Sequence, residues 1–193
     1  MKKYQICLIL LLYLLPLHSE EIKSPYTSIQ AGAFSSHSYS YLAGGLGIYF
    51  DYTRYMSFGY RFFLGKTEQK GFYCYSGFPQ VLTYYGFAHL KPDRMGVIIL
   101  IFAMVIPERF NFHIPINDKS RAGVYLSPYG FDYIKYRQPF SEQYGITCEF
   151  GLQYSYRFAD HMKISPSIGY KTSYNSDHKG ITFEIAVQFD GGK

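Results

Sequence analysis

The stretch from Ile146 to Phe158 alternates strictly between apolar or aromatic residues and small or polar ones. A period of two indicates a β-strand with one apolar and one polar face. Thirteen residues make this strand longer than an ordinary strand of a soluble protein. The fold must therefore accommodate long strands whose two faces meet different surroundings. The apolar set is Ile146, Cys148, Phe150, Leu152, Tyr154, Tyr156 and Phe158.

The same alternation recurs along most of the chain, in segments separated by turn residues. Within one of them, Pro128 and Gly130 shift the phase and predict a β-bulge. An even number of antiparallel strands can close into a barrel with both termini at one end, which removes unpaired edges. The eight predicted strands are 25–34, 41–52, 54–65, 108–117, 120–136, 143–158, 161–174 and 180–189.

The segment 66–107 does not alternate. Its last part, Val97–Ile106, is apolar on every side, which fits either a buried helix or a buried strand. Pro92 favours a helix start and Pro107 a helix stop, whereas the β-branched residues favour a strand. We expect a partly helical apolar insertion; two strands here would instead give a barrel of ten.

Alternation alone does not decide which face points outward. Three features favour an apolar outside, in lipid, over a soluble sandwich or barrel. The strands are long enough for a tilted bilayer crossing, the polar set is rich in small residues that suit a narrow interior, and aromatic residues gather near strand ends, as in membrane barrels. The chain has 22 Tyr and 17 Phe among 193 residues. The sequence thus predicts an all-β fold, a closed antiparallel transmembrane β-barrel.

On these features the chain resembles the small outer-membrane β-barrel proteins of Gram-negative bacteria. The resemblance is most specific over 143–189, a long alternating hairpin followed by a final strand that ends in Phe189. Members of that family often end on an aromatic residue that the barrel-insertion machinery recognises; here four more residues follow, and the chain has no Trp. The resemblance implies location in the cell outer membrane, contact with its lipids and with the insertion machinery, and no cofactor.

The N-terminus has the pattern of a secretory signal peptide. Two lysines precede the apolar run Ile6–Leu15, and Pro16 ends it. Ten residues are too few to span a bilayer as a helix. We expect 1–19 to be the signal peptide and 20–193 to be the barrel domain.

Charged residues on the polar faces predict a cluster inside the barrel. Simple hairpin pairing puts Glu149 opposite Lys171, and pairing of the last two strands puts Glu184 beside Lys171. Arg61 and Arg157 are further lumen charges. These side chains could line a polar pore or fill a closed interior, and the second is favoured because eight strands leave room only for side chains.

With both termini in the periplasm, the connections 35–40, 66–107, 137–142 and 175–179 would be extracellular. Cys74 would then lie in the long outer loop and Cys148 near the outer end of its strand. An oxidising compartment permits a disulfide between them. The alternative is two free thiols.

Nothing in the sequence indicates catalysis. His113 is the only histidine well inside a predicted strand, and no nucleophile elbow, metal-ligand spacing or phosphate loop is present. A net charge of +5 without a Lys/Arg cluster gives no support for nucleic-acid binding. We therefore expect a non-catalytic barrel that supports the envelope or presents loops to an extracellular ligand. A narrow pore or hydrophobic-solute conduit and a lipid-modifying enzyme are the alternatives.

Overall fold

The computed structural model describes residues 25–36, 40–67, 71–89, 94–136, 141–174 and 179–190. The predicted signal peptide, 1–19, lies outside these ranges. Neither helix in the described part of the chain has the length and apolar character to cross a membrane. The strands are β1 (Tyr26–Ser36), β2 (Ser40–Thr53), β3 (Met56–Thr67), β4 (Phe72–Gly77), β5 (Arg109–Pro115), β6 (Ser120–Tyr136), β7 (Ser141–Ala159), β8 (Met162–Ser173) and β9 (Lys179–Asp190), and the helices are α2 (Phe78–His89) and α3 (Arg94–Met104).

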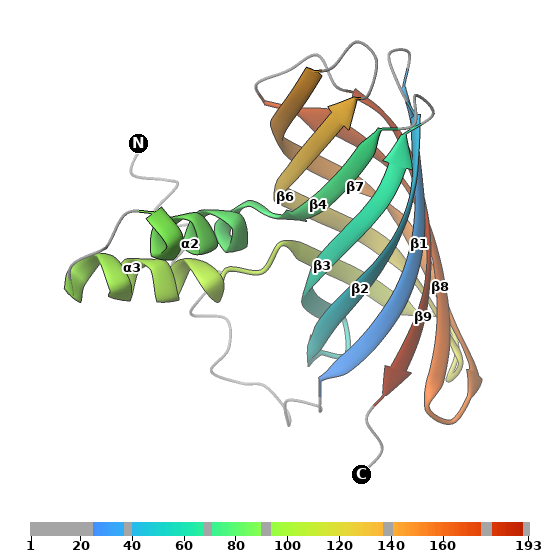
Figure 1. Ribbon diagram of the computed structural model, residues 1–193. Helices are drawn as coiled ribbons and strands as arrows, with labels where there is room; N and C mark the ends of the chain where they lie inside the picture. Colours follow the sequence, from blue (N-terminus) through green and yellow to red (C-terminus); the bar gives the residue numbers. More distant parts are fainter. Residues whose placement is uncertain are drawn as a thin grey trace.

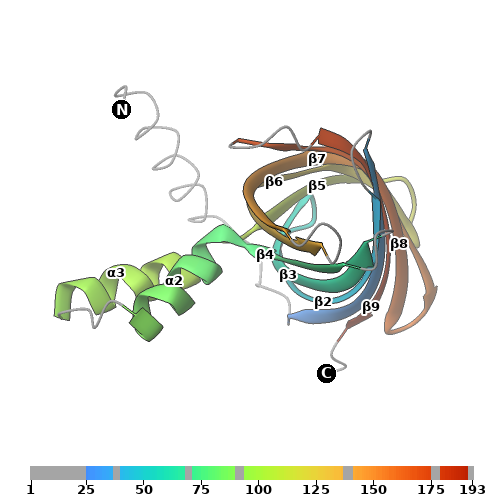
Figure 2. The ribbon, with the colours of Figure 1, turned by 45° about the horizontal axis from the view of Figure 1, so that its top comes forward.

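The strands form a closed antiparallel barrel (Figures 1 and 2). Closure comes from the pairing of β1 with β9. β4 and β5 share one place in the wall, since both pair with β3 on one side and with β6 on the other. The barrel is therefore eight strands wide, as predicted, with its fourth strand built from two pieces. The ten-strand alternative is wrong because the apolar segment forms helices.

The helices leave the wall between β4 and β5 and project sideways from its middle (Figures 1 and 2). Ser76 pairs with Phe62, and Arg109 pairs with Gly59. An uninterrupted strand would have reached Gly59 with residue 79, so the insertion adds 30 residues, which is 109 minus 79.

The prediction of a long extracellular connection over 66–107 is thus wrong in its extent and its place. Residues 72–77 belong to the barrel wall, and the helical insertion begins after Gly77. The six residues of β4 alternate, but six are too few to stand out beside a long apolar segment.

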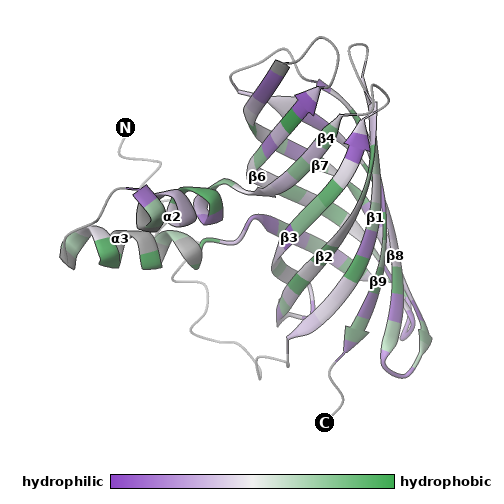
Figure 3. Ribbon diagram, viewed as in Figure 1, coloured by the Kyte–Doolittle hydropathy of each residue, from purple (hydrophilic) through white to green (hydrophobic). Residues whose placement is uncertain are grey.

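The outside of the barrel is apolar and the inside is polar. Leu42, Leu152 and Ile114 point outward and are 61–71% exposed, whereas Ser28 and Gln30 of the inner face are at most 4% exposed. Figure 3 shows the resulting alternation of apolar and polar residues along the strands. This arrangement is that of a barrel surrounded by lipid, as predicted.

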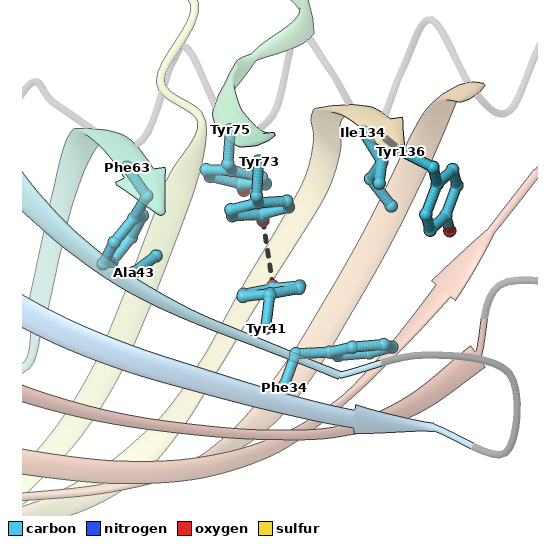
Figure 4. Packing of buried hydrophobic residues seen from close by; sticks show 8 residues of the cluster. All are labelled: Phe34, Tyr41, Ala43, Phe63, Tyr73, Tyr75, Ile134 and Tyr136. Atoms are coloured by element: carbon cyan, nitrogen blue, oxygen red, sulfur yellow. Dashed lines mark hydrogen bonds between the residues drawn. The ribbon is translucent and has the colours of Figure 1, made fainter. Parts of the chain in front are cut away.

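Small residues make the interior narrow enough to be filled. Gly151 and Gly169 face each other across β7 and β8. A Cβ on Gly151 would collide with the ring of Tyr125, and one on Gly169 would collide with its hydroxyl, so this side chain occupies the space that the glycines leave. Towards the end of the barrel away from the start of β1 and the end of β9, a second group of side chains packs inside the wall (Figure 4). This aromatic cluster consists of Phe34, Tyr41, Ala43, Phe63, Tyr73, Tyr75, Ile134 and Tyr136.

The predicted bulge in β6 is confirmed. The pairing of β6 with β7 shifts between Ser127 and Gly130. Inward-facing residues are odd-numbered before this point, as at Tyr125, and even-numbered after it, as at Asp132. The shift lies at the level where the helices leave the neighbouring strand, since Gly77 pairs with Gly130.

We predict that the barrel folds without the helices. In a variant with residues 78–108 replaced by one Val, Gly77 would face Arg61, the Val would face Tyr60, and Arg109 would keep its place opposite Gly59. Both halves of the fourth strand keep their hydrogen bonds, so the refolded protein should show the heat-dependent gel mobility of a folded barrel.

The matched control replaces the same residues by two Val. One extra residue turns every side chain of β5 to the other face, so this variant should fold in lower yield. Equal yields of the two variants, or no folding of the first, would contradict the proposed register.

Candidate functional site: a charged cluster inside the barrel

Seven charged side chains from six parts of the wall meet in the barrel interior. Three are cationic and four are carboxylates, and none is more than 9% exposed. We call them the lumen cluster. Its members are Arg61 (β3), Glu108 (preceding β5), Arg109 (β5), Asp132 (β6), Glu149 (β7), Lys171 (β8) and Glu184 (β9).

Arg61 is the centre of the cluster. Its guanidinium binds both carboxylate oxygens of Glu108, with Nη2 2.7 Å from Oε1 and Nε 3.1 Å from Oε2. Nη2 also lies 3.2 Å from Oε2 of Glu149, and Nη1 donates to Glu184. One cation thus serves three buried carboxylates. The planar guanidinium fork also allows the two-point contact with Glu108, which a lysine ammonium would not provide.

Arg109 neutralises the second oxygen of Glu184, from which its Nη1 is 2.6 Å distant. Its guanidinium lies 3.6 Å from the centre of the Tyr125 ring, a cation–π contact. Tyr125 in turn donates its hydroxyl to Glu149 at 2.7 Å, and Thr182 donates to the same carboxylate oxygen at 2.8 Å. The carboxylates of this half of the cluster are therefore held by several donors each.

Lys171 forms the other half, within the aromatic cluster. Its Nζ lies 3.3 Å from Oδ1 of Asp132, and it donates to the hydroxyls of Tyr41 at 2.9 Å and Tyr73 at 3.2 Å. The same ammonium is 4.5 Å from the centre of the Tyr75 ring. Figure 4 shows Tyr41 and Tyr73 joined by their own hydrogen bond. The ammonium is thus desolvated but fully coordinated.

The structure places three of the predicted residues around one small cavity: Glu149, Lys171 and Glu184 all line it. Glu149 stands directly opposite Lys171, as predicted. Glu184 does not stand beside Lys171; it pairs with Ser167, and Lys171 pairs with Gly180. The strands are offset by four residues from the predicted pairing, so the ion pairs of Glu184 go to arginines.

The other two predicted lumen charges separate. Arg61 lies at the centre of the cluster. Arg157 lies near the end of β7, where it is 3.8 Å from Asp190 and its side chain is 40% exposed. The prediction that Arg157 belongs to the interior cluster is wrong, since strict alternation gives the face of a strand but not the height along the barrel.

The disulfide that the sequence left possible is not formed. Cys74 and Cys148 are both free thiols. Cys74 lies in β4 and Cys148 in β7, and β6 runs between these strands. Two strand spacings are about 9.5 Å, and Cα atoms more than about 7 Å apart cannot be bridged without backbone movement.

Three members of the cluster were missed in the sequence. Arg109 shares the phase of Asn111, a polar residue of the same alternating strand that is buried on the inner face. Asp132 would have been found by carrying the predicted bulge through to the inner face. Glu108 gave no signal, because it follows the insertion and enters the barrel only where the wall is interrupted.

The chemistry of the cluster is that of a structural plug. The cavity beside it leaves room for about one water molecule. Among the described residues, no group of His, Cys, Asp and Glu is suited to hold a metal ion. His113, the histidine that the sequence placed inside a strand, lies 3.2 Å from Arg121 through its Nε2. A cation at that place does not orient a catalytic base as a carboxylate does.

The fold is similar to those of solved outer-membrane barrels. Neisserial surface protein A matches 89% of this chain and 100% of its own, at 9% identity and a TM-score of 0.57. Ail, the attachment invasion locus protein of Yersinia pestis, matches 89% and 99% at 10% identity and 0.51. The N-terminal barrel domain of OprF from Pseudomonas aeruginosa matches 88% and 100% at 10% identity and 0.50.

No family model and no curated protein sequence matches the chain. At these identities the structural likeness concerns the backbone arrangement alone. The chain thus has the fold of the small outer-membrane β-barrels.

We predict that Arg61→Met destabilises the barrel by about 3–5 kcal/mol, because the change leaves buried carboxylates without their cation. Urea unfolding of the protein in lipid vesicles, followed by gel mobility, measures the loss. The matched control is Arg157→Ala, which removes an exposed, distant ion pair and should cost about 0–1 kcal/mol. Equal effects of the two substitutions would contradict the central role of Arg61.

Proposed function

We propose that this protein is a non-catalytic outer-membrane β-barrel with a closed interior, which anchors in the envelope and presents its outer connections to extracellular ligands. The observation that carries the proposal is the filled lumen. A pore needs a continuous wet path, whereas here the lumen cluster and the aromatic cluster occupy the interior.

The energetic argument favours a permanently closed state. Displacing Arg61 to open a path would expose three carboxylates to one another in a region of low dielectric. Displacing Lys171 would break its contacts with Asp132, Tyr41 and Tyr73 together. Both halves of the plug therefore resist the rearrangement that conduction would need.

The outer surface supports location in the outer membrane. Its apolar residues form a belt around all of the wall, and the closed barrel leaves no strand edge to the lipid. Export would use the N-terminal segment 1–19. Insertion would use the final strand, in which Phe189 pairs with Thr27 and Met162.

The site of contact with a ligand would be the end of the barrel opposite to the start of β1 and the end of β9. There the strands continue beyond the interior cluster, and the ends of β6 and β7 carry an ion pair between Lys135 and Glu142 at 2.9 Å. Both side chains are charged and 41% exposed, which suits water and not lipid around this end. The name of the structurally similar Ail, attachment invasion locus protein, is compatible with such a role.

We predict that the purified protein gives no steady single-channel conductance steps in a planar lipid bilayer. A porin inserted into the same bilayer serves as the positive control, and heat-dependent gel mobility shows that the sample is folded. Reproducible steps from the folded protein would overturn the closed interior and favour the alternative of a narrow pore.

A further inference from the structure

The arm formed by α2 and α3 is rooted at mid-height in the apolar belt of the barrel. It leaves the wall after Gly77 and returns at Arg109. Above the root, the outward-facing Phe72 on β4 is 44% exposed; below it, Phe112 and Ile114 on β5 are 42% and 71% exposed. Apolar wall continues on both sides of the root, so the arm emerges inside the belt and not at its rim (Figures 1 and 3).

The arm carries an apolar surface of its own. From Phe78 to Ala88 and from Met95 to Pro107 the sequence contains no Asp, Glu, Lys or Arg. The exposed apolar side chains run along its length: Leu82 at 44%, Met95 at 64%, Ile98 at 47%, Ile101 at 52% and Val105 at 60%. A helix that is apolar on every side, as α3 is after its first residue, Arg94, belongs in apolar surroundings. In water this surface would be a large unfavourable patch.

Several polar groups at the root of the arm are paired within the protein. Tyr60 donates its hydroxyl to the carbonyl of Val105 at 2.7 Å, and Gln80 donates to the carbonyl of Ile106 at 2.9 Å. The Thr83 hydroxyl bonds back to the carbonyl of Pro79 at 2.8 Å. Helices and such side-chain bonds meet the requirement that backbone groups in hydrocarbon be paired.

We propose that the arm lies within the hydrocarbon layer of the membrane and binds lipid acyl chains along its length. This rests on the outer-membrane placement proposed above. The occupant follows from continuity: the lipid that covers Phe72, Phe112 and Ile114 on the wall also covers the arm that starts between them. Figure 2 shows the helices extending away from the barrel, so this lipid reaches the arm.

Arg61 fixes the arm to the barrel from the inside. Glu108 is the last residue before β5, and its backbone N–H bonds to the carbonyl of Gly59 at 3.0 Å while its carboxylate passes through the interrupted wall to Arg61. The arm is thus joined at its base to the lumen cluster. Its apolar helix α2 is about 18 Å long at 1.5 Å per residue, and it extends into the surrounding lipid.

The absence of Trp from the chain makes the test direct, because any Trp introduced is the only indole in the protein. Ile101→Trp and Met95→Trp report on the arm, Leu152→Trp on the barrel belt, and Asp118→Trp on the exposed turn between β5 and β6. Each full-length variant is refolded into phospholipid vesicles with and without bromine on the acyl chains, and folding is checked by heat-dependent gel mobility.

We expect brominated acyl chains to cause as great a loss of emission from the two arm variants as from Leu152→Trp, with blue-shifted spectra, and little loss from Asp118→Trp. Arm emission that is red-shifted and unquenched would place the arm in water and overturn the proposal. Blue-shifted emission that bromine does not quench would mean that protein covers the arm, and would also overturn it. If Leu152→Trp itself is unquenched, the membrane placement of the barrel fails with it.

Discussion

The guanidinium of Arg61 holds together parts of the chain that are distant in sequence. Glu108, Glu149 and Glu184 come from the end of the insertion, from β7 and from β9, and all three reach the same cation. Because the barrel surroundings are apolar, each carboxylate would be costly to bury alone. The arrangement of the wall, of the interior and of the insertion at this level therefore depends on one side chain.

The remaining architecture follows from the placement of apolar residues on the outside of the barrel and polar residues on the inside. Apolar residues face lipid, so the interior cannot be held by hydrophobic packing alone. Glycines narrow the space, tyrosines fill it, and hydroxyl groups supply donors to the carboxylates, as Tyr125 does for Glu149. The high tyrosine content thus has two uses, one at the outer surface and one as the polar and aromatic filling of the lumen.

The sequence predicted the features that alternation controls. Eight strands, the bulge in β6 and the position of Glu149 opposite Lys171 all follow from a period of two and short turns. Glu184 shows what alternation cannot predict. Sliding β9 by four residues along β8 keeps every side chain on the same face of the sheet, so alternation does not determine the height of Glu184 along the barrel. Nor could it reveal Glu108, whose carboxylate enters the lumen through an interruption that only the three-dimensional pairing discloses.

The divided fourth strand also has a consequence for how the barrel tolerates change. Strands β3 and β4 form one hairpin, and β5 and β6 form another, closed at the opposite end of the barrel. The two hairpins meet at mid-height, where Gly77 and Arg109 are not joined directly. The wall therefore contains a seam, the junction between β4 and β5, at which the chain leaves and re-enters the barrel on its apolar outer side. A change in the length of the insertion at this seam would not alter the register of the strand pairs on either side of it.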